Sequence, residues 1–410
     1  MGCYIFCLFG TGGDLYPCVP VAKHLAERGH RVTVAANQHF QGLFDSPDIE
    51  FVSIGAQADY LRAVEDPRHW AGRGILWTLQ AYLGAAIEPV FRLIESRRGE
   101  RPVVVATGNA FGARFAEQVL GVCLYTVVYA PAFLISEGRF PYPYNRGWWS
   151  RMPTWAHRTI MRLTDWMADR QLVPALNIWR RDLGLAPLSR YIPSTKRRAV
   201  AFFPAWFDDL AAMAASEVLQ GDFVYHHASE TGQLPGRIEQ FLCHGTPTVV
   251  VTFGTGVAHV RERFEKLVDA FSGHPLRAIF LTRFDANKPR NAAEHVLVES
   301  GADLAVLLPR CALLVHHGGI GTVAQAMRAG VPQLVIPITY DQPDNGFRVR
   351  ALGLGDLLEG EWDSASVRSR IESVIANADH VKLREIRDRI ISRDGTGCIA
   401  DILERVAVVH

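Results

Sequence analysis

Short apolar runs alternate with amphipathic segments along both halves of the chain. In the first half the pattern predicts strands at Tyr4–Phe9, Arg31–Ala36, Phe51–Ile54, Arg101–Thr107, Cys123–Tyr129 and, as the last of this half, Ala199–Phe203, with helices at Pro17–Arg28 and Ala110–Leu120. The second half predicts strands at Thr248–Phe253, Arg277–Leu281, Ala312–His316 and Gln333–Ile336, with helices at Glu262–Phe271, Leu304–Pro309 and Thr322–Ala329. Because strands that alternate with helices pair in parallel, we predict an α/β protein with two doubly wound, Rossmann-like domains.

Two interruptions of this alternation predict the domain boundaries. Residues 137–198 are rich in Trp and Pro and read as a helical, aromatic insertion in an N-terminal domain spanning 1–221. Residues 222–236 are polar and read as a linker to a C-terminal domain at 237–385, and 386–410 as a helix that packs back on the N-terminal domain. Ligands of such domains bind at the carboxyl ends of the strands, so we expect the two domains to face each other across a ligand cleft. The insertion either packs on the sheet or forms an apolar acceptor pocket.

Composition narrows the class of protein. A chain of 410 residues is too long for one ordinary core, which agrees with two domains. Its 43 basic and 42 acidic residues leave a formal charge of +1, which argues against nucleic-acid binding. Seven cysteines without a CxxC pair indicate reduced thiols in a cytoplasmic protein. The apolar start reads as a first strand, and the apolar stretch Leu120–Ile135 is too short to span a bilayer.

A glycine-rich loop, GTGGDLYP, follows the first predicted strand. It resembles the dinucleotide fingerprint GxGxxG, but Leu15 takes the place of the third glycine and the second strand does not end in an acid. Binding of a nicotinamide or flavin cofactor is therefore not expected. Asp14 has two interpretations: it caps the following helix, or it accepts a proton from a substrate hydroxyl as a general base.

A second glycine-rich loop, HHGGIGT, joins a predicted strand to a predicted helix. Glycines allow a close approach of the backbone, and a helix N-terminus offers free N–H groups and partial positive charge. We therefore predict a diphosphate site made by His317, Gly319, Gly321 and Thr322, together with Gly254 and Thr255 from the loop after another strand. The chain has no DxD motif, so we expect no metal, and no Lys follows the glycines as in a Walker loop.

Asp341 and Gln342 come one loop after this site. An acid beside an amide can both accept and donate hydrogen bonds to sugar hydroxyls. Alone the pair would read as turn chemistry, but its place after the HHGG loop predicts contact with the sugar of a nucleotide-sugar donor.

The stretch HHGGIGTVAQAMRAGVPQLVIPITYDQPDN resembles the donor signature of the UDP-glycosyltransferase superfamily, whose members are inverting, metal-independent enzymes of GT-B fold. The loop GTGGDLYP is similar to that of bacterial antibiotic and sterol glycosyltransferases. The segments EDPRHW, GILWTLQAYLGAAIEPVF, FFPAWF and DQPDN are similar to the catalytic chain of bacterial rhamnolipid rhamnosyltransferases. The chain departs from the plant members, which have His where Asp14 stands and Trp-Asn where Ile320 and Gly321 stand.

The resemblance implies roles for further residues. Asp14 would be the general base, Leu308 and Pro309 would contact the nucleoside, and Gly12, Gly13 and Trp77 would line the acceptor side. The expected reaction moves a hexose or deoxyhexose from a dTDP-rhamnose or UDP-glucose type donor to a hydroxyl of a lipid or natural product. No cofactor is implied, and a lipid acceptor would imply peripheral membrane contact. Two alternatives stay open: a sugar-nucleotide epimerase of the same fold, and a non-catalytic partner of an active glycosyltransferase.

Overall fold

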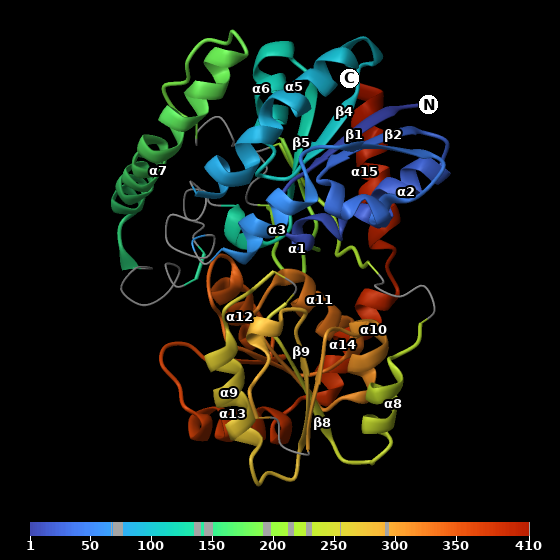
Figure 1. The fold of residues 1–410 in the computed structure, drawn as a ribbon, viewed down its shortest axis with the longest axis vertical. Helices are drawn as coiled ribbons and strands as arrows, with labels where there is room; N and C mark the ends of the chain where they lie inside the picture. Colours follow the sequence, from blue (N-terminus) through green and yellow to red (C-terminus); the bar gives the residue numbers. More distant parts are fainter. Residues whose placement is uncertain are drawn as a thin grey trace. The chain divides into compact units, whose positions relative to one another are not determined.

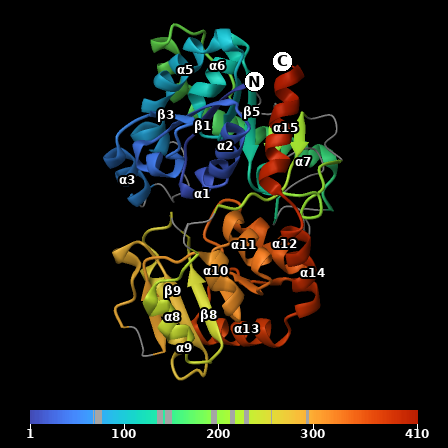
Figure 2. The same cartoon turned by 90° about the vertical axis from the view of Figure 1, so that its right-hand side faces the viewer.

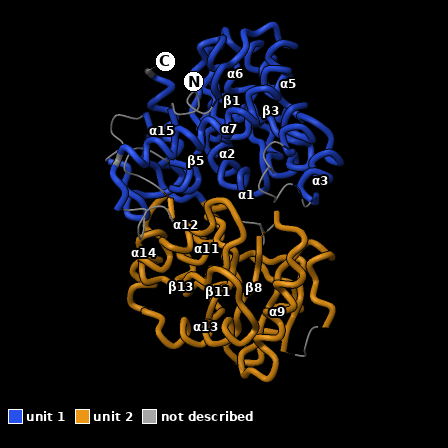
Figure 3. Tube along the Cα trace, turned by 90° about the vertical axis from the view of Figure 1, so that its left-hand side faces the viewer, with its two compact units in different colours: residues 1–140, 144–224, 395–410 blue, residues 141–143, 225–394 orange. Residues whose placement is uncertain are grey.

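The structure is a computed structural model that describes residues 1–66, 68, 77–134, 141–142, 151–191, 198–211, 217–226, 232–254, 256–291 and 295–409. The chain divides into two compact units (Figure 3). Unit 1 holds Met1–Phe140, Tyr144–Val224 and Gly395–His410, and unit 2 holds Pro141–Pro143 and Tyr225–Asp394. These units end at Val224 and Asp394, whereas the sequence analysis places the boundaries at 221 and 385.

Unit 1 is built on a parallel sheet of seven strands in the order β3-β2-β1-β4-β5-β6-β7 (Figure 1). The strands are β1 (Cys3–Leu8), β2 (Arg31–Ala36), β3 (Ile49–Ser53), β4 (Val103–Ala106), β5 (Cys123–Val128), β6 (Ala199–Ala201) and β7 (Val218–Gln220). The central strand β1 is buried almost throughout, as expected for a strand with helices on both faces of its sheet. The prediction that residues 199–203 form the last strand of this half is wrong, because β7 pairs with β6 at the sheet edge.

The helices of unit 1 follow the strands in the alternating order of the pattern. They are α1 (Gly12–Leu15), α2 (Cys18–Glu27), α3 (Gln57–Glu65), α5 (Ile87–Ser96), α6 (Phe111–Leu120), α7 (Thr154–Asp182) and α15 (Gly395–Val409), with shorter turns at Gln38–Phe44, Leu79–Leu83, Gly84–Ala86, Arg98–Glu100 and Pro131–Phe133. Pro17 is the N-cap of α2, because the loop first makes the short helix α1. Figures 1 and 2 show α15 beside α2, although the two are at opposite ends of the sequence.

The contact of α15 with unit 1 is both charged and apolar. Arg28, at the end of α2, lies 2.6 Å from Asp401 and 2.8 Å from Glu404. His30 contacts the same Glu404 at 2.7 Å. Beneath these pairs, Ile399 and Leu403 are fully buried. The last helix of the chain therefore completes the core of the first unit.

Unit 2 repeats the architecture with a parallel sheet of six strands in the order β10-β9-β8-β11-β12-β13. The strands are β8 (Thr248–Thr252), β9 (Arg277–Leu281), β10 (Val296–Glu299), β11 (Leu313–His316), β12 (Gln333–Val335) and β13 (Gly355–Leu357). The helices are α8 (Gly236–Leu242), α9 (Arg261–Phe271), α10 (Leu304–Leu307), α11 (Ile320–Ala329), α12 (Gln342–Ala351), α13 (Ser364–Ala376) and α14 (His380–Ile391), with turns at Asp285–Asn287 and Leu308–Arg310. Two parallel α/β sheets confirm the predicted fold class.

None of the described helices is both long enough and apolar enough to cross a membrane.

Candidate functional site

The strand order of unit 2 brings two glycine-containing loops together. The strand β8 lies between β9 and β11. After β8 the chain continues to β9 on one side, and after β11 it continues to β12 on the other, so the strand order reverses between β8 and β11. Thr252 at the end of β8 pairs with His316 at the end of β11. The loops that begin after these two residues therefore lie side by side at the carboxyl edge of the sheet.

His317 lies between these loops, against two glycines. A methyl group added at Gly254 would lie 2.7 Å from Cε1 of His317, and one at Gly319 would lie 2.5 Å from its Nε2. Gly254 also has a φ of +79°, which a residue with a side chain rarely adopts. His317 is only 9% exposed, and its Nδ1 is buried without a hydrogen-bond partner among the described residues. A buried polar atom of this kind usually has a partner, so the ring is set up to gain one from a ligand or from water.

The neighbouring His316 has a structural role. Its side chain is fully buried, and its Nε2 lies 3.0 Å from Oε1 of Gln333 on β12. Its Nδ1 accepts a hydrogen bond of 3.2 Å from the backbone N–H of Gly318. His316 therefore fixes the start of the loop that carries His317 and Gly319.

Both imidazoles are neutral at pH 7. Burial and the neighbouring ring of His317 lower the pKa of His316 to about 3. Burial alone lowers the pKa of His317 to about 4. A neutral ring carries one N–H, so His317 offers a ligand a hydrogen bond and no positive charge.

These two histidines should make the protein less stable in mild acid. Below pH 6.5 both histidines bind a proton in the unfolded chain, whereas the buried rings of the folded protein stay neutral. The free energy of unfolding should therefore fall by about 1.4 kcal/mol per pH unit for each histidine until the pH nears the pKa of the folded ring, about 4 for His317 and about 3 for His316. Denaturant titrations at several pH values would measure this slope. His317→Ala should remove one share of this slope. An equal slope in the His317 variant would contradict the neutral, buried ring.

The N-terminus of α11 is open beside His317. Gly319 is the N-cap and has no side chain to satisfy the first amides, and its carbonyl accepts hydrogen bonds from Thr322 and Val323. Gly321 is exposed, and a methyl group there would meet nothing within 4 Å. Free amides and the helix dipole favour an anion at this place. The structure thus brings together His317, Gly254, Gly319, Gly321 and Thr322 of the predicted diphosphate site, while Thr255 lies outside the described residues.

Asp341 and Gln342 stand at the start of α12, and neither is wholly available to a ligand. The Oε1 atom of Gln342 accepts hydrogen bonds from the backbone N–H groups of Ile338 (2.8 Å) and Thr339 (2.9 Å), which closes the preceding loop. Only its NH₂ group can serve a ligand as donor. Asp341 accepts a hydrogen bond of 2.7 Å at Oδ2 from Asn345. The pair can still offer donors from one side chain and an acceptor from the other.

Asn345 connects the glycine loop and Asp341, the two parts of the predicted donor site, and no sequence motif indicates this role. Its fully buried Nδ2 donates to the backbone carbonyl of Gly318 at 2.9 Å and to Oδ2 of Asp341 at 2.7 Å. Gly318 has a φ of +93°, and a methyl group there would lie 2.7 Å from Val335. The amide of Asn345 therefore fixes the glycine loop and the Asp341 side chain relative to each other.

Nearby, Tyr142 contacts the same helix. Its backbone N–H donates to Oδ1 of Asp344 at 2.8 Å, its ring stacks on Phe347 with centroids 5.0 Å apart, and its hydroxyl lies 2.5 Å from Glu359. Asp344 is buried and also pairs with Arg348. These contacts fix the first turn of α12, directly after Gln342.

In unit 1, Asp14 lies in the short helix α1 after β1. Its Oδ2 accepts hydrogen bonds from the backbone N–H of Thr11 (2.7 Å) and from the Thr11 hydroxyl (3.2 Å), which is a capping box. Burial raises the pKa of Asp14, although the two Thr11 bonds act the other way. A raised proton affinity suits a general base. Oδ2 thus closes the first turn of α1, whereas α2, the helix that Asp14 was expected to cap, has Pro17 at its N-cap and no side-chain cap. No hydrogen bond within the described chain uses Oδ1, so the role of general base stays a prediction.

The loop around Asp14 is held from several sides. Thr107 donates to the carbonyl of Phe9 at 2.8 Å and accepts from its N–H at 2.9 Å. The hydroxyl of Tyr129 donates to the backbone carbonyl of Asp14. Gly10 has a φ of +144°, and a methyl group there would meet the Asp14 carboxylate at 2.3 Å. The carboxylate position is thus fixed by strand ends that the fold brings together.

The remaining predicted site residues lie in different surroundings. Leu308 is fully buried in the core of unit 2, so it can offer a nucleoside only its backbone, whereas Pro309 is exposed. Gly12 is buried against the ring of Tyr16, and Gly13 is exposed. Trp77 is half-buried, with the guanidinium of Arg68 4.9 Å from its ring.

No metal site is evident among the described residues. Among the residues that the structure describes, no three His, Cys, Asp or Glu side chains come together in a group that could hold a metal ion.

Known proteins resemble this chain along its whole length. A family model described as the glycosyltransferase family 28 N-terminal domain matches residues 4–120, and one described as the erythromycin biosynthesis protein CIII-like C-terminal domain matches residues 287–405. A sterol 3-beta-glucosyltransferase of Arabidopsis thaliana is 24% identical, over 97% of this chain and 66% of the relative. An O-mycaminosyltylonolide 6-deoxyallosyltransferase of Streptomyces fradiae is 26% identical, over 84% of this chain and 82% of the relative.

Among solved structures, the glycotransferase of kitacinnamycin superposes with a TM-score of 0.72 at 18% identity and covers 98% of both chains. This likeness confirms the GT-B fold. The two family models together cover more than half of the chain, and almost all of it matches curated glycosyltransferases, so this protein is a glycosyltransferase of the UDP-glycosyltransferase superfamily.

Proposed function

We propose that this enzyme transfers a hexose or deoxyhexose from a nucleoside diphosphate sugar to a hydroxyl of an apolar acceptor, with inversion at the anomeric carbon and without a metal. One observation carries the proposal: the neutral, buried His317 lies against Gly254 and Gly319, beside the uncapped N-terminus of α11. A diphosphate would receive hydrogen bonds from the ring and from the helix amides. These donors are fixed before the reaction and face the charge that develops as the sugar leaves.

The donor is of dTDP-rhamnose or UDP-glucose type. Two named relatives support this range, because one is a glucosyltransferase and the other a deoxyallosyltransferase. Asp341 and the NH₂ group of Gln342 would hold the sugar hydroxyls, and the backbone at Leu308 and Pro309 would face the nucleoside. The free thiols of all seven cysteines support a cytoplasmic location as part of the proposal.

In the proposed reaction, Asp14 takes the proton of the acceptor hydroxyl through its Oδ1 atom. The oxygen attacks the anomeric carbon as the bond to the diphosphate breaks, so configuration inverts. Gly12, Gly13 and Trp77 belong to the acceptor side of this proposal. The acceptor is a lipid or an apolar natural product, and the names of the sterol and tylonolide enzymes support such a hydroxyl-bearing acceptor.

A thermal-shift panel tests the donor class. UDP, dTDP, UDP-glucose and dTDP-rhamnose should raise the Tm of the intact protein, since a ligand at 100 times its Kd adds about 2.7 kcal/mol to the free energy of unfolding. ADP and GDP serve as controls for the base. If no nucleoside diphosphate raised the Tm, the proposed donor site would be refuted. Incubation of the stabilising donor alone, followed by a search for an epimer, separates transfer from epimerisation.

Asn345→Ala should damage donor use without changing the acceptor side. Losing the two hydrogen bonds from Nδ2 takes this partner from the Gly318 carbonyl and one hydrogen bond from Asp341, which should raise the KM for the donor about tenfold or more. Initial rates at varied donor and acceptor concentrations would measure the two KM values separately. Asn377→Ala is a matched control, because that amide bonds to Ser373 at the end of α13 and to no other residue that the structure describes. Equal changes in both KM values would contradict the positioning role.

A further inference from the structure

The long helix α7 of unit 1 has two differently placed halves. Its C-terminal half is anchored: Leu172 and Leu176 are buried, and the ring of Trp179 packs so closely on Gly84 that a methyl group there would lie 2.0 Å from it. Arg180 is buried as well and donates to Gln118 at 3.0 Å and to the carbonyl of Ala186 at 2.7 Å. The helix is therefore firmly attached to unit 1 (Figure 1).

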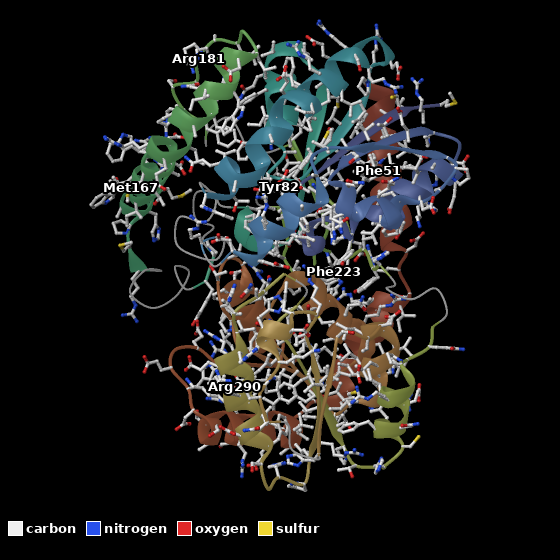
Figure 4. The ribbon with its side chains drawn as sticks, viewed as in Figure 1. Phe51, Tyr82, Met167, Arg181, Phe223 and Arg290 are labelled. Atoms are coloured by element: carbon white, nitrogen blue, oxygen red, sulfur yellow. The ribbon has the colours of Figure 1, made fainter. Side chains whose placement is uncertain are left out.

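The N-terminal half of α7 exposes a row of large apolar side chains. They are between 39% and 69% exposed and comprise Trp155, Ile160, Leu163, Trp166 and Met167. Their spacing puts them on one side of a helix with 3.6 residues per turn, and Met167 on this half is labelled in Figure 4. We call these five residues the α7 face. No other described helix exposes more than two large apolar side chains.

The charges around the α7 face have one sign. The exposed charged residues between Trp155 and Gln171 are Arg158, Arg162 and Arg170. The two acids of this half are less exposed than these arginines: Asp165 is half-buried, and the buried Asp169 accepts a hydrogen bond of 2.8 Å from the backbone of Tyr191. The guanidinium of Arg170 lies 4.9 Å from the ring of Trp166, at the face itself. The exposed surface is thus apolar and positive, with no exposed acid.

This combination is what a helix at a membrane surface requires. Such a helix lies in the plane of the interface, with Trp and aliphatic side chains in the acyl boundary and Arg or Lys at the anionic headgroups. Each Arg near an anionic surface strengthens binding. We propose that the α7 face docks unit 1 on the surface of an anionic lipid bilayer.

The proposal concerns where the enzyme works and does not depend on the donor or on the reaction. If the acceptor is a lipid, the same face would bring unit 1 to the surface that contains it. Because the test below measures binding without turnover, its failure would leave the proposed function untouched.

Sedimentation of the intact protein with phosphatidylcholine vesicles, with and without phosphatidylglycerol, tests the apolar part. The wild type should bind the vesicles that contain phosphatidylglycerol. Leu163→Glu/Met167→Glu should bind at least about tenfold more weakly, since two apolar side chains leave the acyl boundary and two negative charges are added. The matched control is Val381→Glu/Ile391→Glu on α14, whose wild-type side chains are 59% and 60% exposed. That variant should bind as the wild type does.

The charge is tested separately. Arg162→Gln/Arg170→Gln should bind about 25-fold more weakly, at about a factor of five for each arginine, and high salt should weaken the wild type similarly. Arg237→Gln/Arg384→Gln, in unit 2, controls for a change in net charge. Thermal unfolding and the Tm shift with a nucleoside diphosphate verify that each variant is folded.

Several results would overturn the proposal. They are wild-type binding by the folded Leu163 and Met167 variant, equal binding of the wild type to vesicles without phosphatidylglycerol, and no binding to any vesicle. A further overturning result would come from light scattering. If the wild type were a dimer and Leu163→Glu/Met167→Glu a monomer, the α7 face would be a contact between two copies of the chain and not a membrane-binding surface.

Discussion

Asp14→Asn is expected to lower kcat by about 10²–10⁴, the usual contribution of a positioned base. Asparagine keeps the shape of aspartate and caps a helix as well as it does, so the Thr11 hydrogen bonds to this position can persist. The loss would therefore report proton transfer and not a damaged loop. Initial rates with saturating donor and acceptor measure it. Because burial raises the pKa of Asp14, the acidic limb of the wild-type profile should lie above the ordinary aspartate pKa of about 3.9, and the variant should lack that limb.

Asp363→Asn is the matched control for this experiment. Asp363 also belongs to a capping box, but as the N-cap residue of α13, where its carboxylate accepts the N–H of Ser366 at 2.8 Å, whereas Asp14 is the third helical residue of α1. Its replacement should leave kcat unchanged. If Asp14→Asn also kept the wild-type kcat, Asp14 would be a cap only, and the base would have to be sought elsewhere.

His317→Ala is expected to weaken binding of UDP or dTDP by about 10- to 100-fold, because a hydrogen bond to a charged group contributes about 1.5–3 kcal/mol. Isothermal titration of the nucleoside diphosphate measures the change without an acceptor. The neutral state of the ring predicts that this affinity changes little between pH 6 and 8, as far as His317 determines it.

His244→Ala controls for the loss of an imidazole from unit 2, since His244 is exposed at the end of α8. It should bind the nucleotide as the wild type does. Unchanged affinity in His317→Ala, with the fold intact, would remove His317 from the diphosphate site.

The sequence predicted the parts of the fold where a strand is a continuous apolar run that ends at a polar or glycine-rich loop. β2, for example, has its predicted bounds, and β8 and β11 differ from theirs by one residue at one end. It missed the edge strands β7, β10 and β13. Gly355 and Asp356 break the apolar run of β13, and the three residues of β7 are all half-buried. Strands at or near the edge of a sheet can be only three residues long, and so short an apolar run cannot be told from a loop by its pattern.

The candidate site divides in the same way. The cradle of His317 and its glycines is local in sequence and was predicted from the motif. Asn345 acts across 27 residues on Gly318, and nothing in the spacing shows that its amide also reaches Asp341. The side-chain oxygen Oε1 of Gln342 accepts hydrogen bonds from two backbone N–H groups because the turn at Ile338 and Thr339 brings them to it. Such contacts depend on the path of a loop, which a hydrophobic pattern does not encode.

The position of α15 affects how this protein must be made. Unit 1 begins with Met1 and is not complete until Gly395–Val409 has been synthesised. Translation of the roughly 170 residues that separate Val224 from Gly395 takes about 10–35 s at 5–20 residues per second. During this time the nascent chain carries an N-terminal unit whose apolar surface, later covered by Ile399 and Leu403, is still open to chaperones or to aggregation. A ribosome that stops before Gly395 therefore releases a chain whose first unit lacks the part of its core that α15 supplies.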